Sequence, residues 1–167
     1  MYKTHKQQAH PPLRPVVSQC DSPTEKLAQL CNNILNQAVS LIPTNITSTE
    51  MFMKRLQKKF SGKLTEKHIL FSADITALYT NIPLKHCLDV TTAFIRNNAE
   101  EIDMMGLTMN EFETILEAIM NLGYFRFHEL FFQQIKGLAM GSRPAPPLAI
   151  LYVYLTVELP LLSLIHI

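Results

Sequence analysis

Apolar residues recur at steps of three and four along several segments of this 167-residue chain, which is the period of one face of an α-helix. Three of these segments begin with a serine or threonine followed three residues later by glutamate, the spacing of a capping box. The pattern predicts helices that start at Ser22–Glu25, Thr47–Glu50 and Thr108–Glu111. The positions predicted to face the core are Leu27, Leu30, Cys31, Ile34, Leu35, Ala38 and Leu41 in the first helix, Phe52, Leu56 and Phe60 in the second, and Phe112, Ile115, Leu116 and Ile119 in the third.

Other patterns separate these helices. His68–Ala73 is a short apolar run, and it predicts a buried strand that delivers Asp74 at its carboxyl end. The remaining predicted elements are a helix from Pro83 to about Asn97, a β-hairpin of Tyr124–Phe127 and Leu130–Ile135, a turn region over Gly137–Pro147 and a last helix over Leu148–Leu159. Helices and strands do not alternate regularly, so the order predicts an α+β fold.

The charge is unevenly distributed along the chain. Residues 1–70 hold ten Lys/Arg against four Asp/Glu, a balance of +6, and residues 71–167 hold five against ten, a balance of −5. A basic front half suits contact with phosphates, although a solvated charged surface has the same composition. Cys20, Cys31 and Cys87 lack the paired spacing of a zinc module, and the polar N-terminus lacks a secretory signal. These features predict an intracellular protein, nuclear or cytoplasmic, that is not secreted.

The C-terminal segment Leu148–Ile167 is twenty residues long and mostly apolar, which is enough to span a membrane. It also contains Glu158 and Pro160, and a carboxylate is costly in lipid. A buried helix of a protein with no membrane contact is the favoured interpretation, and a membrane anchor is the alternative.

Asp74 is the first of the residues that could carry chemistry. An aspartate held at a strand end suits Mg²⁺, which prefers hard oxygen ligands, and phosphoryl transfer uses carboxylates to hold two such ions. Tyr79 follows five residues later, within the string SADITALYTNIP. This string resembles motif A of the reverse transcriptases of Penelope-like retroelements, which are related to telomerase. The resemblance implies that Asp74 binds metal with help from the Ile75 carbonyl, and that the Tyr79 ring rejects a 2′-hydroxyl.

Two further segments resemble the same family, in the order that it requires. Lys3-Thr4-His5-Lys6 and LRPVVS resemble its fingers segment, which implies that Arg14 contacts the triphosphate of the incoming nucleotide. The segment GLAMGSRPAPPLA resembles motif B, although Arg143 stands where the family has proline and Ala145 where it has serine. The residues that the resemblance places along the template and nucleotide are Gly137, Met140, Gly141 and Ser142.

The resemblance implies part of a right-hand polymerase, with fingers over about residues 1–66 and the front of the palm over about 67–161. Its activity is RNA-directed DNA polymerisation with two Mg²⁺ ions, an RNA template, a DNA primer and deoxynucleoside triphosphates. It says nothing about protein partners. The family's motif C is a pair of aspartates, and no such pair occurs in this chain, so we expect the chain alone to be inactive. Residues 162–167 resemble a translated sequencing adaptor.

A different class of function also fits part of the sequence. Lys54, Arg55, Lys58 and Lys59 lie on the polar face of the second predicted helix. They predict a non-catalytic nucleic-acid-binding module as the alternative. The acidic cluster Glu100, Glu101 and Asp103 falls in a polar connection, where a solvated loop is the simpler interpretation.

Overall fold

Over the residues that the structure describes, the fold is helix-rich with a small antiparallel sheet, which confirms the α+β prediction at that level. The computed structural model describes residues 16, 21–60 and 72–165; Arg14, Lys3–Lys6 and most of the predicted strand lie outside them. The elements are α1 (Glu25–Ser40), α2 (Thr49–Phe60), α3 (Leu78–Asn81), α4 (Leu84–Asn97), α5 (Met109–Asn121), β1 (Tyr124–Phe127), β2 (Leu130–Gln133), α6 (Ala145–Val153), the π-helical turn η1 (Tyr154–Glu158) and α7 (Leu159–Ile165).

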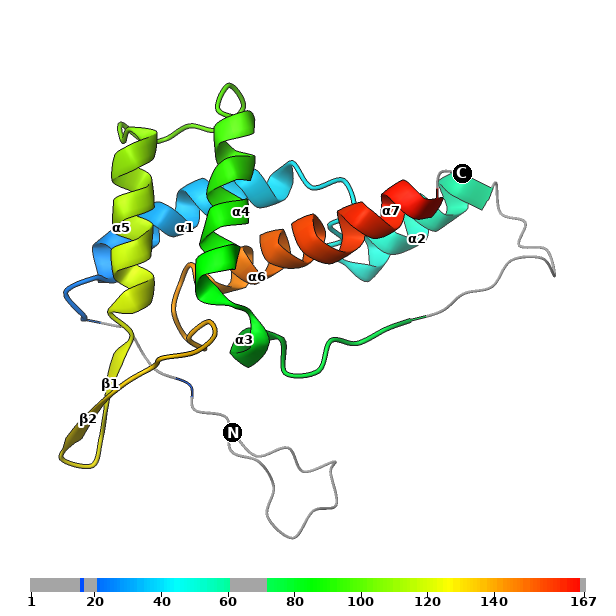
Figure 1. Cartoon of the computed structure of the whole chain (residues 1–167). Coiled ribbons are helices and arrows are strands. Elements are labelled where there is room, and N and C mark those ends of the chain that lie inside the picture. The colour runs from blue at the N-terminus through cyan, green and yellow to red at the C-terminus, as the bar shows by residue number, and fades with distance from the viewer. Residues whose placement is uncertain (1–15, 17–20, 61–71, 166–167) are drawn as a thin grey trace, which may run out of the picture.

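Four helices enclose the hydrophobic core. Helix α1 packs against α5 and α6, and α4 packs against the same two helices. Figure 1 shows α4 and α5 side by side in front of α1, with α6 continuing through η1 into α7. The core therefore joins α1, from the predicted fingers, to helices of the predicted palm. Its largest fully buried side chains include Ile34 and Leu35 on α1, Ile95 on α4, Phe112 and Leu116 on α5, and Leu148 and Leu151 on α6.

The predicted inward faces are confirmed for α5 and for most of α1. Leu27 and Leu30 are the exceptions: the Leu27 side chain is 43% exposed, Leu30 is half-buried, and neither belongs to the buried stripe that runs from Ala28 to Val39. The prediction is wrong for α2, which contains no buried residue. Phe52 is 42% exposed, and Leu56 and Phe60 are half-buried.

Only one of the three predicted capping boxes forms. Thr108 accepts a hydrogen bond from the Glu111 backbone, and the Glu111 carboxylate accepts one from the Thr108 backbone N–H. Helix α1 instead begins after Thr24, whose side chain makes no capping hydrogen bond. The Glu25 carboxylate accepts a hydrogen bond from the Asp21 N–H at 2.8 Å, not from the backbone of Ser22. At α2 the capping oxygen is that of Ser48, 3.1 Å from the Met51 nitrogen. The predicted residue spacing is present at all three helix starts, but at α1 the Glu25 carboxylate accepts from a different backbone N–H, and at α2 a different hydroxyl oxygen accepts.

The predicted strand before Asp74 is wrong for the residues of it that the structure describes, since Ser72 and Ala73 are not in a strand. A strand needs a neighbour to satisfy its backbone groups, and the described sheet pairs only β1 with β2. The predicted hairpin is confirmed, with Phe127 opposite Leu130 and Tyr124 opposite Gln133. It projects beyond the end of α5 in Figure 1.

The last helix is longer than predicted at both ends. It begins at Ala145, because Pro146 and Pro147 occupy the first turn, where the missing N–H groups have no helical partner to lose. It continues to Ile165 through η1, where the Leu159 N–H bonds to the Tyr154 carbonyl. This wider turn lies directly before Pro160, whose ring clashes with a carbonyl four residues earlier in a regular α-helix.

One helix among the described residues, Ala145–Ser163, is long and apolar enough to cross a membrane. Its most apolar window has a mean hydropathy of 1.5, and 33% of that window is buried inside the chain. Leu148 and Leu151 are fully buried, whereas Val157 and Leu159 are exposed. Core helices of soluble proteins pass the same test of length and composition, so this finding is weak evidence for a membrane span.

Candidate functional site

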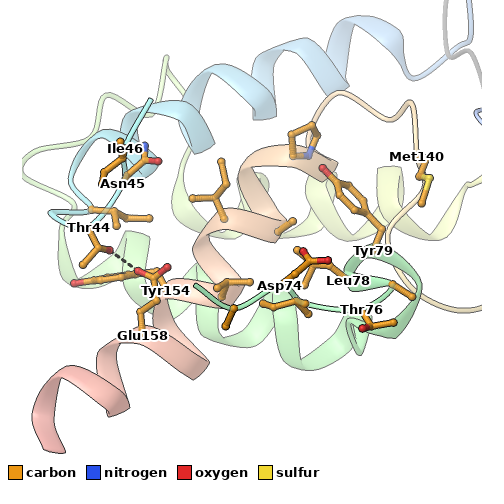
Figure 2. A pocket seen from close by; sticks show the side chains of 18 residues that line it. Thr44, Asn45, Ile46, Asp74, Thr76, Leu78, Tyr79, Met140, Tyr154 and Glu158 are labelled. Atoms are coloured by element: carbon orange, nitrogen blue, oxygen red, sulfur yellow. Dashed lines mark hydrogen bonds between the residues drawn. The ribbon is translucent and has the colours of Figure 1, made fainter. Parts of the chain in front are cut away.

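A pocket of about 660 Å³ lies where four distant segments of the chain meet. It is lined by the α1–α2 connection, by residues 73–79, by Met140 and by one side of the α6–η1 helix. Figure 2 shows Asp74 and Tyr79 on the same side of this pocket, with Met140 beyond Tyr79 and Glu158 at the other end. Four residues named from the sequence, Asp74, Ile75, Tyr79 and Met140, therefore line one cavity.

The Asp74 carboxylate is available to a ligand. The residue is exposed, and within the part of the chain that the structure describes it makes no hydrogen bond or ion pair. Ile75 follows it in the same non-helical segment. A free carboxylate and the backbone carbonyl of the residue that follows it are hard oxygen donors of the kind that Mg²⁺ prefers. The residues present fit part of a magnesium site, since two oxygens leave most of the coordination shell to water and other ligands.

Tyr79 reaches the pocket through an unusual turn. Ala77 has a φ of 52°, in the left-handed region that a residue with a Cβ rarely adopts. The chain then enters α3, which is one turn long and has no buried residue. Tyr79 itself is half-buried and packs against the edge of the core. The left-handed residue turns the chain so that Asp74 and Tyr79, five residues apart, both line the cavity.

Gly137 lies against the backbone that carries Tyr79. A Cβ at Gly137 would lie 2.4 Å from the Tyr79 carbonyl oxygen and 2.7 Å from the Thr80 Cα. The next residue, Leu138, donates its N–H to the same Tyr79 carbonyl at 2.7 Å. The structure thus joins the first residues of the segment that resembles motif B to residues 79 and 80 of the segment that resembles motif A.

The rest of the motif B segment lies at the start of α6. Gly141 is exposed with a φ of 106°, and the Ser142 carbonyl accepts a hydrogen bond from the Ala145 N–H. Ser142 is 3% exposed, and its hydroxyl has no hydrogen-bond partner among the described residues. Neither residue is among those that line the pocket.

The two departures from the motif B pattern are accommodated by this fold. Arg143 bonds to Glu25 at 3.1 Å and to Gln29 at 2.7 Å, so it ties the loop to α1. The Asp21 N–H, and after it the Arg143 guanidinium, hold the pKa of the Glu25 carboxyl below its ordinary value. Ala145 is fully buried at the first turn of α6, where a serine hydroxyl would need a partner.

Most of the residues that line the pocket were not predicted as site residues, and the polar ones among them include Thr44, Asn45 and Glu158. Thr44 and Asn45 lie in the α1–α2 connection, and Glu158 ends the π-helical turn. The Thr44 hydroxyl donates a hydrogen bond to the Glu158 carboxylate, drawn as a dashed line in Figure 2. The sequence did hold a signal for Glu158, because a lone carboxylate in an apolar helix needs either water or a partner.

Other chemistries have little support among the described residues. No group of three or more His, Cys, Asp or Glu side chains there could hold a metal ion alone. Burial raises the pKa of the Cys31 thiol to about 11 and that of the Cys87 thiol to about 12. Both thiols stay protonated at neutral pH, so neither is an activated nucleophile.

Comparisons with known proteins found no match to this chain. No protein-family model matches the chain, no curated protein matches it, and no solved structure matches it.

Proposed function

We propose that this chain forms the nucleotide-binding part of a reverse transcriptase, an RNA-directed DNA polymerase of the Penelope-like retroelement type. The observation that carries the proposal is the shared pocket: Asp74, Tyr79 and Met140 come from two separate motifs and line the same cavity. The contact of Gly137 with the Tyr79 backbone supports it further, because motifs that serve one site must meet in space.

The proposed roles follow from the chemistry of each group. The Asp74 carboxylate and the Ile75 carbonyl hold magnesium, and the Tyr79 ring lies beneath the sugar of the incoming deoxynucleotide, where it leaves no room for a 2′-hydroxyl. When bound, two Mg²⁺ ions stabilise the attacking 3′-hydroxyl of the primer and the leaving pyrophosphate oxygens. Arg14 holds phosphate, and the exposed Gly141 faces the template, whereas Ser142 is buried beside it and supports the loop from within.

The proposal assigns α1 and α2 to the fingers and α4 to α6 to the front of the palm. Its partners are an RNA template, a DNA primer and deoxynucleoside triphosphates, and it needs no membrane. Polymerisation also requires carboxylates beyond Asp74, and the chain contains no adjacent pair of aspartates. We therefore expect nucleotide binding, but no primer extension, from these 167 residues alone.

Replacing Asp74 by asparagine tests the metal role. We expect the wild-type chain to bind a deoxynucleoside triphosphate more tightly with Mg²⁺ than without it, and Asp74→Asn to weaken the magnesium-dependent part about tenfold or more, because the amide carries no charge. Titration calorimetry with and without Mg²⁺ measures both effects. Asp89→Asn is the matched control, because it removes the same charge from an exposed aspartate on α4. It should bind the nucleotide as the wild type does.

Two results would contradict these expectations, the first the metal role of Asp74 and the second the inactivity of the chain alone. Equal magnesium dependence in Asp74→Asn and wild type would remove Asp74 from the metal site. Magnesium-dependent primer extension by the unaltered chain, lost in Asp74→Ala, would show instead that the chain is active alone.

A second candidate is a non-catalytic nucleic-acid-binding module. Its supporting observation is that four basic side chains are exposed on α2, namely Lys54, Arg55, Lys58 and Lys59. Lys54 is already paired with Glu50 at 2.7 Å, so the test uses Lys58 and Lys59. This candidate predicts salt-sensitive binding to a single-stranded oligonucleotide that survives Asp74→Asn and is lost in the double variant Lys58→Gln, Lys59→Gln. Binding measured by fluorescence anisotropy at two salt concentrations separates the candidates.

A further inference from the structure

We infer that Gly137 is the positioning residue for Tyr79, and that it sets the preference of the site for deoxyribose through that tyrosine; the second part rests on the proposed function. This positioning role differs from the direct contact with template or nucleotide that the resemblance implies for Gly137. Its basis is the close approach of two backbone segments that are far apart in the sequence.

The segment that carries Tyr79 cannot hold the tyrosine in place by itself. Helix α3 is four residues long, begins after the left-handed residue Ala77 and buries none of its own residues. A single helical turn is unstable in isolation, because nucleation fixes several dihedral angles for one hydrogen bond. The position of the Tyr79 ring must therefore be fixed by contacts from elsewhere in the fold.

Residues 137 and 138 supply such contacts. The Leu138 N–H bonds to the Tyr79 carbonyl at 2.7 Å, and the Leu138 side chain is buried at 1% exposure. The space that a Cβ of residue 137 would need is occupied by the Tyr79 oxygen, at 2.4 Å, and by the Thr80 Cα, at 2.7 Å. Both obstacles are backbone atoms, which cannot rotate away as a flexible side chain can. A larger residue forces one of the two backbone segments to shift, and because the loop is anchored by the buried Leu138 we expect α3, and Tyr79 with it, to move away from the loop.

A second glycine, Gly106, allows the effect of this close contact to be distinguished from the effect of backbone strain. Gly137 has a φ of 77° and Gly106 has a φ of 84°, so alanine is strained at both positions to a similar degree. A Cβ at Gly106 would meet nothing within 4 Å. Gly106→Ala is therefore the matched control for Gly137→Ala.

The test uses the full chain labelled with 3-fluorotyrosine, with Tyr79 assigned by the loss of one fluorine resonance in Tyr79→Phe. We expect Gly137→Ala to shift the Tyr79 resonance and Gly106→Ala to leave it in place, with thermal unfolding showing that both variants are folded. An unmoved Tyr79 resonance in Gly137→Ala, or equal shifts in both variants, would overturn the inference.

Nucleotide selectivity supplies the second readout. The ratio of deoxynucleotide to ribonucleotide affinity should fall about tenfold in Gly137→Ala and stay constant in Gly106→Ala. An equal loss of affinity for both nucleotides would indicate a general structural role and would overturn the selectivity part. If the unaltered chain binds neither nucleotide, the proposed function fails and the selectivity part fails with it, while the fluorine spectrum still decides whether Gly137 positions Tyr79.

A measurement on the unaltered chain keeps the inference testable if Gly137→Ala does not fold. The hydrogen bond to Tyr79 predicts slow hydrogen exchange at the Leu138 amide. Exchange at the rate of an unprotected amide would show that the loop does not hold Tyr79.

Discussion

Replacing Phe112 by alanine is expected to lower the free energy of unfolding by about 3–5 kcal/mol, the usual cost of removing a buried phenylalanine ring. Phe112 has no exposed surface, and it lies on α5, the helix that packs against both α1 and α4. The loss is a large share of the roughly 5–15 kcal/mol by which domains are stable. Urea unfolding followed by circular dichroism measures it as a lower midpoint with an unchanged slope.

Phe131 provides the matched control for this prediction. It is the same residue type, its side chain is 75% exposed on β2, and Phe131→Ala should change the stability by no more than about 0.5 kcal/mol. Similar unfolding midpoints for the two variants would mean that α5 does not pack in the core as described.

Replacing Tyr79 by alanine is expected to remove most of the discrimination between deoxynucleotides and ribonucleotides, a change of about tenfold or more in the ratio of their affinities. The reason is steric: under the proposed function the ring occupies the space that a 2′-hydroxyl would need. Competition of the two nucleotides for the magnesium-loaded chain measures the ratio.

The control for this prediction keeps the ring and removes only the hydroxyl. Tyr79→Phe should retain the wild-type ratio, because rejection depends on the volume of the ring rather than on a hydrogen bond from its oxygen. If Tyr79→Phe and Tyr79→Ala lose selectivity equally, the tyrosine acts through its hydroxyl and a steric role is excluded.

The helices of the core were largely predictable from the pattern of apolar residues. The buried stripe of α5 matches its predicted face, and Thr108 caps it as predicted, because both depend on residues within one or two turns of each other. The predictions were wrong where another part of the chain decides the outcome. Phe52 has the spacing of a core residue, yet the structure exposes 42% of it.

The candidate site shows the same division. The string from Asp74 to Tyr79 was singled out from the sequence by its resemblance to motif A of the reverse-transcriptase family. The rest of the pocket could not be predicted, because Thr44 and Glu158 come from segments with no local signal that they meet near Asp74. The strand predicted before Asp74 failed at Ser72 and Ala73, since strand pairing depends on a neighbour that the local sequence does not specify.

The amino-acid sequence by itself determined the amphipathic helices and the hairpin, because these depend on periodicity and on residue types over short distances. The residues of interest came from the resemblance of three segments to a known family. Only the tertiary structure decided that Gly137 must be glycine for a reason of packing. Its missing Cβ makes room for the backbone of Tyr79 and Thr80, and no local rule predicts which distant segment will lie there. The joining of the two motifs is therefore a property of the folded chain.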